Sequence, residues 1–363
     1  MRIAQVAPLY ESVPPARYGG TERVVSYLTE ELVSRGHDVT LFASGDSRTR
    51  ARLVPGVPRA LRLDAGCRDP LARHLLLLER VFEAAESFDL IHFHVDYLHF
   101  PLSRRMQTPQ MTTLHGRLDL PDLVPLYREF SEMPLVSISS AQRVPIPDAG
   151  WIGTVPHGLP PASLRFGEGR GGYFAFLGRI AREKRLDRAI EIARRAGRRL
   201  LVAAKIDPAD AEYHEREIAP LLTDPHVTFL GEIGEEDKSA FLGEAEALLF
   251  PIDWPEPFGL VMIESLACGT PVIAYRGGSV EEVLEDGRTG FLVSSIAEAI
   301  DAVRRLPSID RRQCREAFER RFTVERMAGD YERLYERIVQ ARGAGRPPQP
   351  PRLAAAPRVA EAV

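Results

Sequence analysis

Short apolar segments alternate with amphipathic helices along this chain, and the whole pattern occurs twice. Strands are predicted at residues 1–8, 39–44, 88–94, 111–116 and 135–139 of the first half, and at residues 173–178, 199–206, 227–231, 247–252 and 271–275 of the second. Continuous apolar strands that alternate with helices are typical of parallel sheets covered on both faces. The sequence therefore predicts an α/β protein with two Rossmann-like, doubly wound parallel sheets. Ligands of such sheets bind beyond the carboxyl ends of the strands.

The two halves meet at residues 151–172, a segment rich in glycine and proline that is typical of a linker. A length of 363 residues suits two domains of about 150 residues each. Residues 1–158 are predicted to form the first domain and residues 159–320 the second. A long amphipathic helix is predicted at residues 321–342, and residues 343–363 form a Pro- and Ala-rich tail that is expected to be disordered.

Composition and net charge limit which binding partners and which cellular compartment are expected for this protein. A net charge of −4 provides no broad basic field for nucleic acid, so no nucleic-acid partner is expected. The three cysteines, Cys67, Cys268 and Cys314, are odd in number and far apart, which fits neither a disulfide framework nor a metal cluster. The start of the chain lacks the features of a signal peptide, and its apolar runs fall far short of the ~20 residues of a membrane span. A cytoplasmic protein without a transmembrane segment is the simplest expectation.

Glu256 and Glu264 are the first candidate binding residues. Glu264 lies on a predicted helix whose surface neighbours at this position are all apolar, namely Leu260, Val261, Ala267 and Cys268. A buried carboxylate is costly without a partner, and the paired hydroxyls of a ribose would suit it. The alternative is a structural glutamate that caps a backbone or pairs with an arginine, and the residues alone favour neither.

Groups suited to a diphosphate lie close to these glutamates in the predicted fold. The helix that carries Glu264 begins near Phe258-Gly259-Leu260, where free backbone N–H groups and the helix dipole favour an anion. Arg179 and Lys184 follow a predicted strand, so they could converge on the same anion from the edge of the sheet. An exposed basic turn is the alternative interpretation of these two residues.

The first half offers weaker signals. Gly19 and Gly20 open a predicted helix and would allow a ligand to approach closely, although a plain turn is an equally good interpretation. His115 follows a predicted strand beside a glycine and is well placed to contact a ligand. His157 lies in the linker, where a hinge contact and a ligand contact are equally probable interpretations.

A histidine cluster raises the question of a metal. His92, His94 and His99 lie close in sequence to Asp96, and such a set can bind zinc. His92 and His94 share one face of the predicted strand, but the placement of His99 is undetermined. Substrate contact or plain packing is therefore preferred, and no metal site is predicted.

The segments that carry these residues resemble, in their order along the chain, glycosyltransferase family 4. Members of this family have the GT-B architecture, in which two Rossmann-like domains face each other across a cleft. The resemblance covers roughly residues 1–340 and is carried by six segments: RYGGTERVVSYLTEEL, TLHG, VPHG, GRIAREK, EPFGLVMIESLACGTPVIA and RGGSVEEVLEDGRTGFLV. The Glu-x7-Glu pattern together with GR…K is specific, whereas each piece alone is not. The resemblance also implies that the last helix crosses back onto the first domain.

The resemblance assigns roles to individual residues. Arg179 and Lys184 would bind the donor diphosphate, and Glu264 would hold the donor ribose. The donor sugar would face Glu256 and the backbone of Phe258, Gly259 and Leu260. His115 would contact the sugar near the reacting centre, Gly19 and Gly20 would line the phosphates and the acceptor side, and the backbone up to Ile233 would read the nucleobase. His115, Arg179, Lys184 and Glu256 form the expected catalytic set.

The expected function is retaining transfer of a hexose from a nucleoside-diphosphate sugar, UDP-linked or GDP-linked, to an unidentified acceptor. The family needs neither a metal nor another cofactor, and the sequence holds no Asp-x-Asp motif. The acceptor, whether a glycan, a lipid-linked or a small molecule, stays open, as does peripheral contact with a membrane. The alternatives are a phosphorylase or nucleotide-sugar epimerase of the same fold, and an inactive nucleotide-sugar-binding protein. A nicotinamide dehydrogenase is disfavoured because the first loop lacks the glycine fingerprint.

Overall fold

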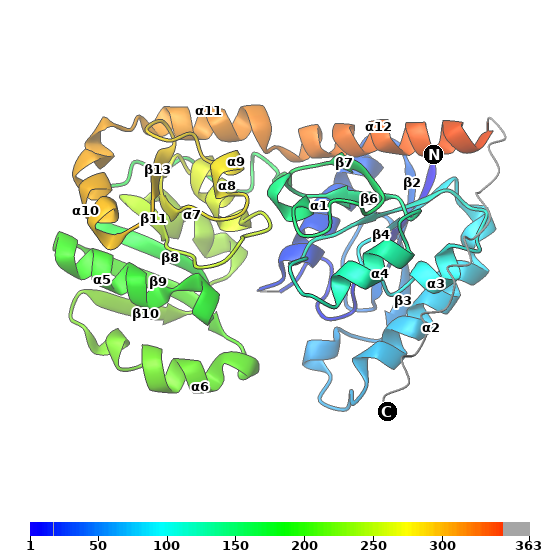
Figure 1. Cartoon of the computed structure of the whole chain (residues 1–363), viewed down its shortest axis with the longest axis horizontal. Coiled ribbons are helices and arrows are strands. Elements are labelled where there is room, and N and C mark those ends of the chain that lie inside the picture. The colour runs from blue at the N-terminus through cyan, green and yellow to red at the C-terminus, as the bar shows by residue number, and fades with distance from the viewer. Residues whose placement is uncertain (17, 344–363) are drawn as a thin grey trace, which may run out of the picture.

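The computed structural model describes residues 1–16 and 18–343 and contains two parallel sheets, one in each half of the chain (Figure 1). The α/β fold predicted from the alternation of strands and helices is confirmed. Residues 344–363, which make up nearly all of the expected disordered tail, lie outside the described residues. Within the described part, no helix has the length and apolar character needed to cross a membrane.

The first sheet has seven parallel strands in the order β3-β2-β1-β4-β5-β6-β7. Its strands are β1 (Arg2–Val6), β2 (Asp38–Ser44), β3 (Arg52–Val57), β4 (Leu90–Phe93), β5 (Gln110–Thr113), β6 (Leu135–Ser137) and β7 (Trp151–Thr154). The accompanying helices are α1 (Gly20–Ser34), α2 (Pro70–Glu83), α3 (Phe100–Ser103) and α4 (Leu123–Glu129).

The second sheet has six parallel strands in the order β10-β9-β8-β11-β12-β13. Its strands are β8 (Tyr173–Ile180), β9 (Arg199–Ile206), β10 (Val227–Gly231), β11 (Ala247–Phe250), β12 (Val272–Tyr275) and β13 (Gly290–Val293). The helices of this half are α5 (Leu186–Ala196), α6 (Ala211–Tyr213), α7 (Glu235–Gly243), α8 (Leu260–Ala267), α9 (Val280–Val283), α10 (Ile296–Arg305) and α11 (Arg311–Arg321).

Strand order reverses once in each sheet, at β1 in the first and at β8 in the second. The chain leaves β1 toward β2 and β3 and later returns to β4 on the other side, and β8 is placed in the same way. Such switch points open a crevice beyond the carboxyl ends of the strands. The segments that follow β1, β4, β8 and β11 are therefore the natural positions for ligand contacts.

Two local predictions need correction. The segment interpreted as a linker begins with β7, which pairs with β6 and completes the first sheet. Strand β8 extends through Ile180, so Arg179 lies inside the strand rather than after it. Pairing with β6 makes a strand of residues 151–154 despite the glycines and prolines around them, and pairing with β9 extends β8 beyond Gly178. The predicted domain boundary at residues 158/159 falls between β7 and β8 and stays a prediction.

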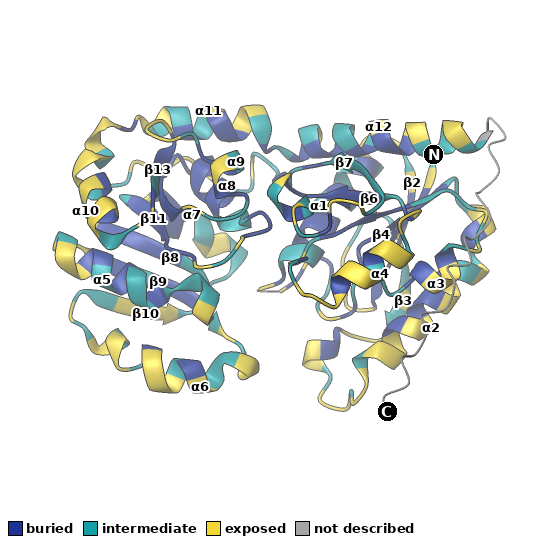
Figure 2. Cartoon of the chain, in the orientation of Figure 1, coloured by how far each residue is buried: buried dark blue, intermediate teal, exposed yellow. Residues whose placement is uncertain are grey.

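The last helix, α12 (Val324–Gly343), crosses back onto the first sheet, as the resemblance implied (Figure 1). Its buried face, which includes Met327, Tyr331 and Tyr335, packs with Ile3 of β1 and Leu28 of α1 in one apolar cluster. Figure 2 shows that burial follows both sheets, while exposed residues mark the outer faces of α2 and α4. Burial of large apolar side chains stabilises such a contact by about 1.5–3 kcal/mol each.

Candidate active site

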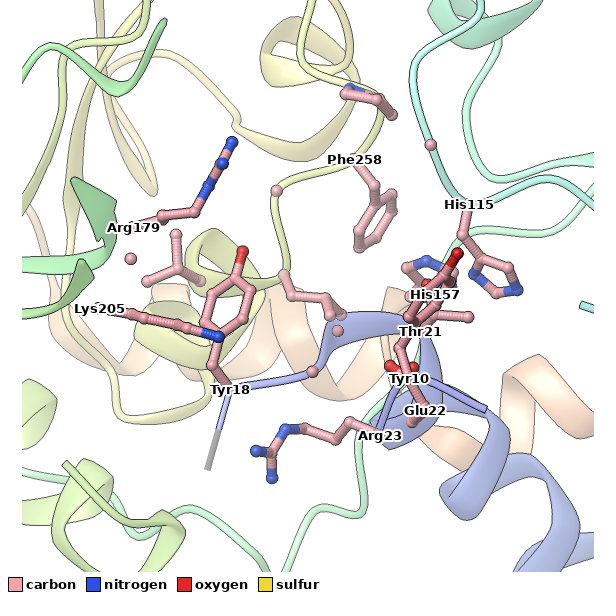
Figure 3. A pocket seen from close by; sticks show the side chains of 18 of the residues that line it. Tyr10, Tyr18, Thr21, Glu22, Arg23, His115, His157, Arg179, Lys205 and Phe258 are labelled. Atoms are coloured by element: carbon pink, nitrogen blue, oxygen red, sulfur yellow. The ribbon is translucent and has the colours of Figure 1, made fainter. Parts of the chain in front are cut away.

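A cavity of about 630 Å³ lies between the two sheets and is lined by residues of both halves (Figure 3). All the residues predicted to form the site line this cavity: Gly19, Gly20, His115, Arg179, Lys184, Ile233, Glu256, Phe258, Gly259, Leu260 and Glu264. The structure thus brings together positions that are far apart in the sequence. Their individual roles in binding and catalysis stay predictions.

Two helix N-termini face each other across the cavity. Helix α1 begins at Gly20 with Gly19 as its N-cap, and α8 begins at Leu260 with Gly259 as its N-cap. A side chain on Gly20 would lie 3.4 Å from Leu260, so the two helix ends approach closely. Gly259 has φ +76, a left-handed conformation that favours glycine. The unpaired N–H groups and the dipoles of both helices suit an anion bound between them.

Lys184 and Glu256 form an ion pair on the second-sheet side of the cavity. Lys184 Nζ lies 2.5 Å from Glu256 Oε2, and Trp254 Nε1 donates a hydrogen bond of 3.0 Å to the same oxygen. The Lys184 ammonium also lies 4.7 Å from the centre of the Trp254 ring. Trp254 therefore orients Glu256. Gly278, at φ +58, supports this loop because any side chain there would clash with the Glu256 backbone.

Arg179 is held by two carboxylates at the edge of the same cavity. Its guanidinium donates hydrogen bonds to Asp210 at 2.8 Å and to Glu183 at 2.6 Å. These bonds keep the guanidinium in a fixed position while the side chain remains part of the cavity lining. A diphosphate would compete with these two acids for the same donors.

Glu264 is buried, as expected from its apolar neighbours, but the structure gives it a partner that sequence reasoning missed. Lys238 Nζ lies 2.5 Å from Glu264 Oε1 and 3.1 Å from Glu235. Glu235 of α7 also pairs with Arg23 of α1 and accepts a hydrogen bond from Tyr27, so the ionic chain joins the two halves. A structural role as an ion-pair partner is thus real for Glu264, although its carboxylate keeps further lone pairs that could accept hydrogen bonds from a ribose.

His115 joins a group of packed histidines. Its ring stacks on His157 at 5.2 Å between centres, and His157 in turn packs edge-on against Phe258 at 4.8 Å. Burial lowers the pKa of His115 to about 3 and that of His157 well below its ordinary value, so both are neutral at neutral pH. His157, for which a hinge contact and a ligand contact were equal alternatives, lines the cavity and also accepts a hydrogen bond from Arg326 through its backbone.

The first-sheet side of the cavity holds residues that the sequence did not single out for this role. Tyr10 follows β1, Asp96 follows β4 and Glu22 lies in the first turn of α1, and all three line the cavity. Burial outweighs the nearby positive charge of Arg62 and raises the pKa of Glu22. Asp96 keeps exposed surface, and the protein around it raises the pKa of its carboxyl group by partial desolvation. Carboxyl groups and a tyrosine ring offer hydrogen bonds and a flat face to a hydroxyl-rich molecule.

The described residues contain no group of three or more histidine, cysteine, aspartate or glutamate side chains arranged to hold a metal ion. His99 is separate from the cavity: its ring nitrogens bond to Ser103 at 2.6 Å and Thr112 at 2.8 Å. The interpretation of His99 as a packing residue fits these contacts.

Burial of His99 predicts a pH-dependent stability. Burial lowers the pKa of His99 to about 3, below its value of 6.5 in an unfolded chain. The unfolded state therefore takes up a proton first as the pH falls below 6.5, and one such histidine should lower the free energy of unfolding by about 2 kcal/mol between pH 6.5 and 5. Urea denaturation of His99→Gln should show a correspondingly shallower pH dependence than wild type. His226→Gln, at a partly exposed histidine, serves as the control, and equal slopes in all three proteins would contradict the prediction.

Two known protein families match this chain, one in each half. Residues 167–321 match the family described as Glycosyl transferases group 1, and residues 18–143 match Glycosyltransferase Family 4. A phosphatidyl-myo-inositol mannosyltransferase of Propionibacterium freudenreichii subsp. shermanii is 25% identical over 343 residues, which cover 84% of this chain and 86% of that protein.

Two solved structures share the fold. AviGT4, a glycosyltransferase involved in avilamycin A biosynthesis, is 24% identical with a TM-score of 0.71, covering 94% of this chain and 98% of that chain. Anabaena HepE in complex with UDP and glucose is 16% identical with a TM-score of 0.72, covering 93% of this chain and 100% of that chain. Together with the two family matches, these likenesses show that the chain is a glycosyltransferase of family 4 with the GT-B fold.

Proposed function

We propose that this glycosyltransferase moves a hexose from a nucleoside-diphosphate sugar to an acceptor bound on the first-sheet side of the cavity. A UDP-sugar is favoured, with a GDP-sugar as the alternative. The observation that carries the proposal is the lining of one cavity by Arg179, Lys184, two helix N-termini and several carboxylates. The HepE structure with UDP and glucose, which has the same fold, supports the class of donor.

In the proposed reaction, the bond between the anomeric carbon and the diphosphate oxygen breaks, and its electron pair stays on the diphosphate. Arg179, Lys184 and the N-termini of α1 and α8 would stabilise the negative charge that develops there. The acceptor oxygen bonds to the anomeric carbon on the face that the diphosphate leaves, and its proton passes to the departing diphosphate. The anomeric configuration is then retained, and fixed protein charges serve where other transferases use a metal.

The remaining polar groups are assigned to the nucleoside of the donor, to its sugar and to the acceptor. Glu264 would accept hydrogen bonds from the ribose hydroxyls, and the backbone near Ile233 would contact the base. Glu256, from the second-sheet side of the cavity, and His115, from the first-sheet side, would meet the sugar hydroxyls. Tyr10, Glu22 and Asp96 are left for the acceptor.

A donor screen tests this function. UDP-glucose, UDP-galactose, UDP-N-acetylglucosamine, GDP-mannose and ADP-glucose are incubated with the protein, with and without a mixture of glycan and lipid acceptors. Acceptor-dependent release of UDP or GDP from one donor is the expected result. Phosphate-dependent turnover would indicate a phosphorylase, conversion of one donor into another an epimerase, and tight binding without turnover an inactive binding protein.

A further inference from the structure

A chain of buried hydrogen bonds connects the C-terminal helix to His115. Gln5 of β1 lies at its centre: its Nε2 donates to Tyr335 Oη of α12 at 3.2 Å, and its Oε1 lies 2.8 Å from His94 Nε2. His94 Nδ1 then lies 2.9 Å from His115 Nε2. Gln5 and Tyr335 are fully buried, and His94 is 2% exposed. Each step joins groups that burial removes from water, so each bond is costly to lose.

A second arm fixes the hydroxyl group of Tyr335. His92 Nδ1 lies 2.8 Å from Tyr335 Oη, and His92 Nε2 lies 2.8 Å from Thr113 Oγ1. Thr113 in turn lies 3.0 Å from the hydroxyl of Tyr331, one turn before Tyr335 on α12. The two tyrosines therefore supply the hydroxyl groups that complete a network reaching across β1, β4 and β5.

The chemistry of these groups determines where the protons lie. A neutral histidine has one N–H and one bare nitrogen, and burial lowers the pKa of His94 and His115 far enough to keep both neutral. The Gln5 oxygen can only accept, so His94 carries its proton on Nε2 and accepts through Nδ1. His115 must then carry its proton on Nε2. Its Nδ1 is left bare, and that atom has no hydrogen-bond partner among the described residues.

We propose that Gln5, His94 and Tyr335 are positioning residues that fix the ring of His115 and its Nε2–H tautomer. The bare Nδ1 then accepts a hydrogen bond from a hydroxyl group of the donor sugar, a step that rests on the proposed function. The crossing of α12 onto the first sheet thus completes the hydrogen bonding of the active site, in addition to burying apolar surface. The tautomer itself requires no ligand and can be measured on the free protein.

Nitrogen-15 NMR of the histidine-labelled protein at pH 7 measures the tautomer directly. The His115 signals are assigned by their loss in His115→Gln. The expected result is a protonated Nε2 and a bare Nδ1 in wild type, and a mixture of both tautomers in Gln5→Met, where neither polar group of the amide remains. A wild-type His115 protonated on Nδ1 or on both nitrogens would overturn the proposal, as would an unchanged tautomer in Gln5→Met.

Turnover measures the consequence for function. Tyr335→Phe removes only the hydroxyl group and should lower kcat by about ten- to a hundredfold, because small misplacements of a reacting group have effects of that size. The dissociation constant of UDP should stay within twofold. Tyr173→Phe is the matched control, since Tyr173 is a buried tyrosine whose hydroxyl donates to Phe241 in the second domain, away from the cavity. An unchanged kcat in Tyr335→Phe, or an equal fall in Tyr173→Phe, would contradict the positioning role. If no donor supports turnover, the proposed function fails while the NMR result still decides the tautomer.

Discussion

Lys184→Met is expected to lower kcat/KM for the nucleotide sugar by about a hundred- to a thousandfold, the effect of removing one group that stabilises developing negative charge. Lys184 is 17% exposed and lines the cavity beside the N-terminus of α8, so its charge acts through partly desolvated surroundings. The measurement is steady-state release of nucleoside diphosphate. Arg182→Met is a control from the same turn, because Arg182 is 67% exposed and faces Glu217. A loss no larger than that of Arg182→Met would contradict the role of Lys184.

The ion pair with Glu256 offers a second interpretation of such a loss. Removing Lys184 leaves Glu256, whose side chain is 8% exposed, without its cation, and that change alone could distort the loop. The double variant Lys184→Met with Glu256→Gln separates the two causes. If Lys184 only neutralises Glu256, the double variant should be as active as the single variant Glu256→Gln. If Lys184 acts on the diphosphate, the double variant should fall below Glu256→Gln by about as much as Lys184→Met falls below wild type.

Glu264→Gln is expected to weaken the binding of both UDP and the intact UDP-sugar by about ten- to a hundredfold, because one charged hydrogen-bond acceptor contributes about 1.5–3 kcal/mol. The two ligands should be affected equally, since both contain the ribose. Isothermal titration calorimetry measures both dissociation constants. Glu256→Gln provides the comparison: it should weaken the UDP-sugar more than UDP, because Glu256 is assigned to the sugar.

Equal affinity of Glu264→Gln and wild type for both ligands would contradict the ribose assignment. Glu264 would then serve only as the partner of Lys238, the interpretation that the 2.5 Å ion pair already supports on the free protein. Lys238 keeps Glu235 as a second ion-pair partner, so Glu264→Gln does not leave the Lys238 ammonium group unpaired.

The alternation of strands and helices was enough to predict the fold because buried parallel strands need continuous apolar runs. Three strands escaped this reasoning, and all three form the edge of a sheet. Strand β3 contains Pro55, β7 lies in a segment rich in glycine and proline, and β13 begins at Gly290. Glycine and proline weaken the sequence signal of a strand, and β3 and β7 are also only partly buried.

The sequence likewise predicted some residues of the site and missed others. Arg179, His115 and Glu264 were found because a strand end or an apolar helix face restricts where such side chains can point. Lys238 and Tyr335 were not, because they reach the site from elements whose packing the local sequence does not specify. Trp254 was not among the predicted site residues either, because its hydrogen bond to Glu256 depends on the shape of a loop that only the folded chain fixes.

A crystal structure of the protein with bound UDP tests the assignment of the cavity most directly. The predicted result places the base against the backbone near Ile233, the ribose at Glu264 and the diphosphate between Arg179, Lys184 and the N-termini of α1 and α8. UDP bound elsewhere, or bound in this cavity with its diphosphate away from both basic residues, would contradict the assignment.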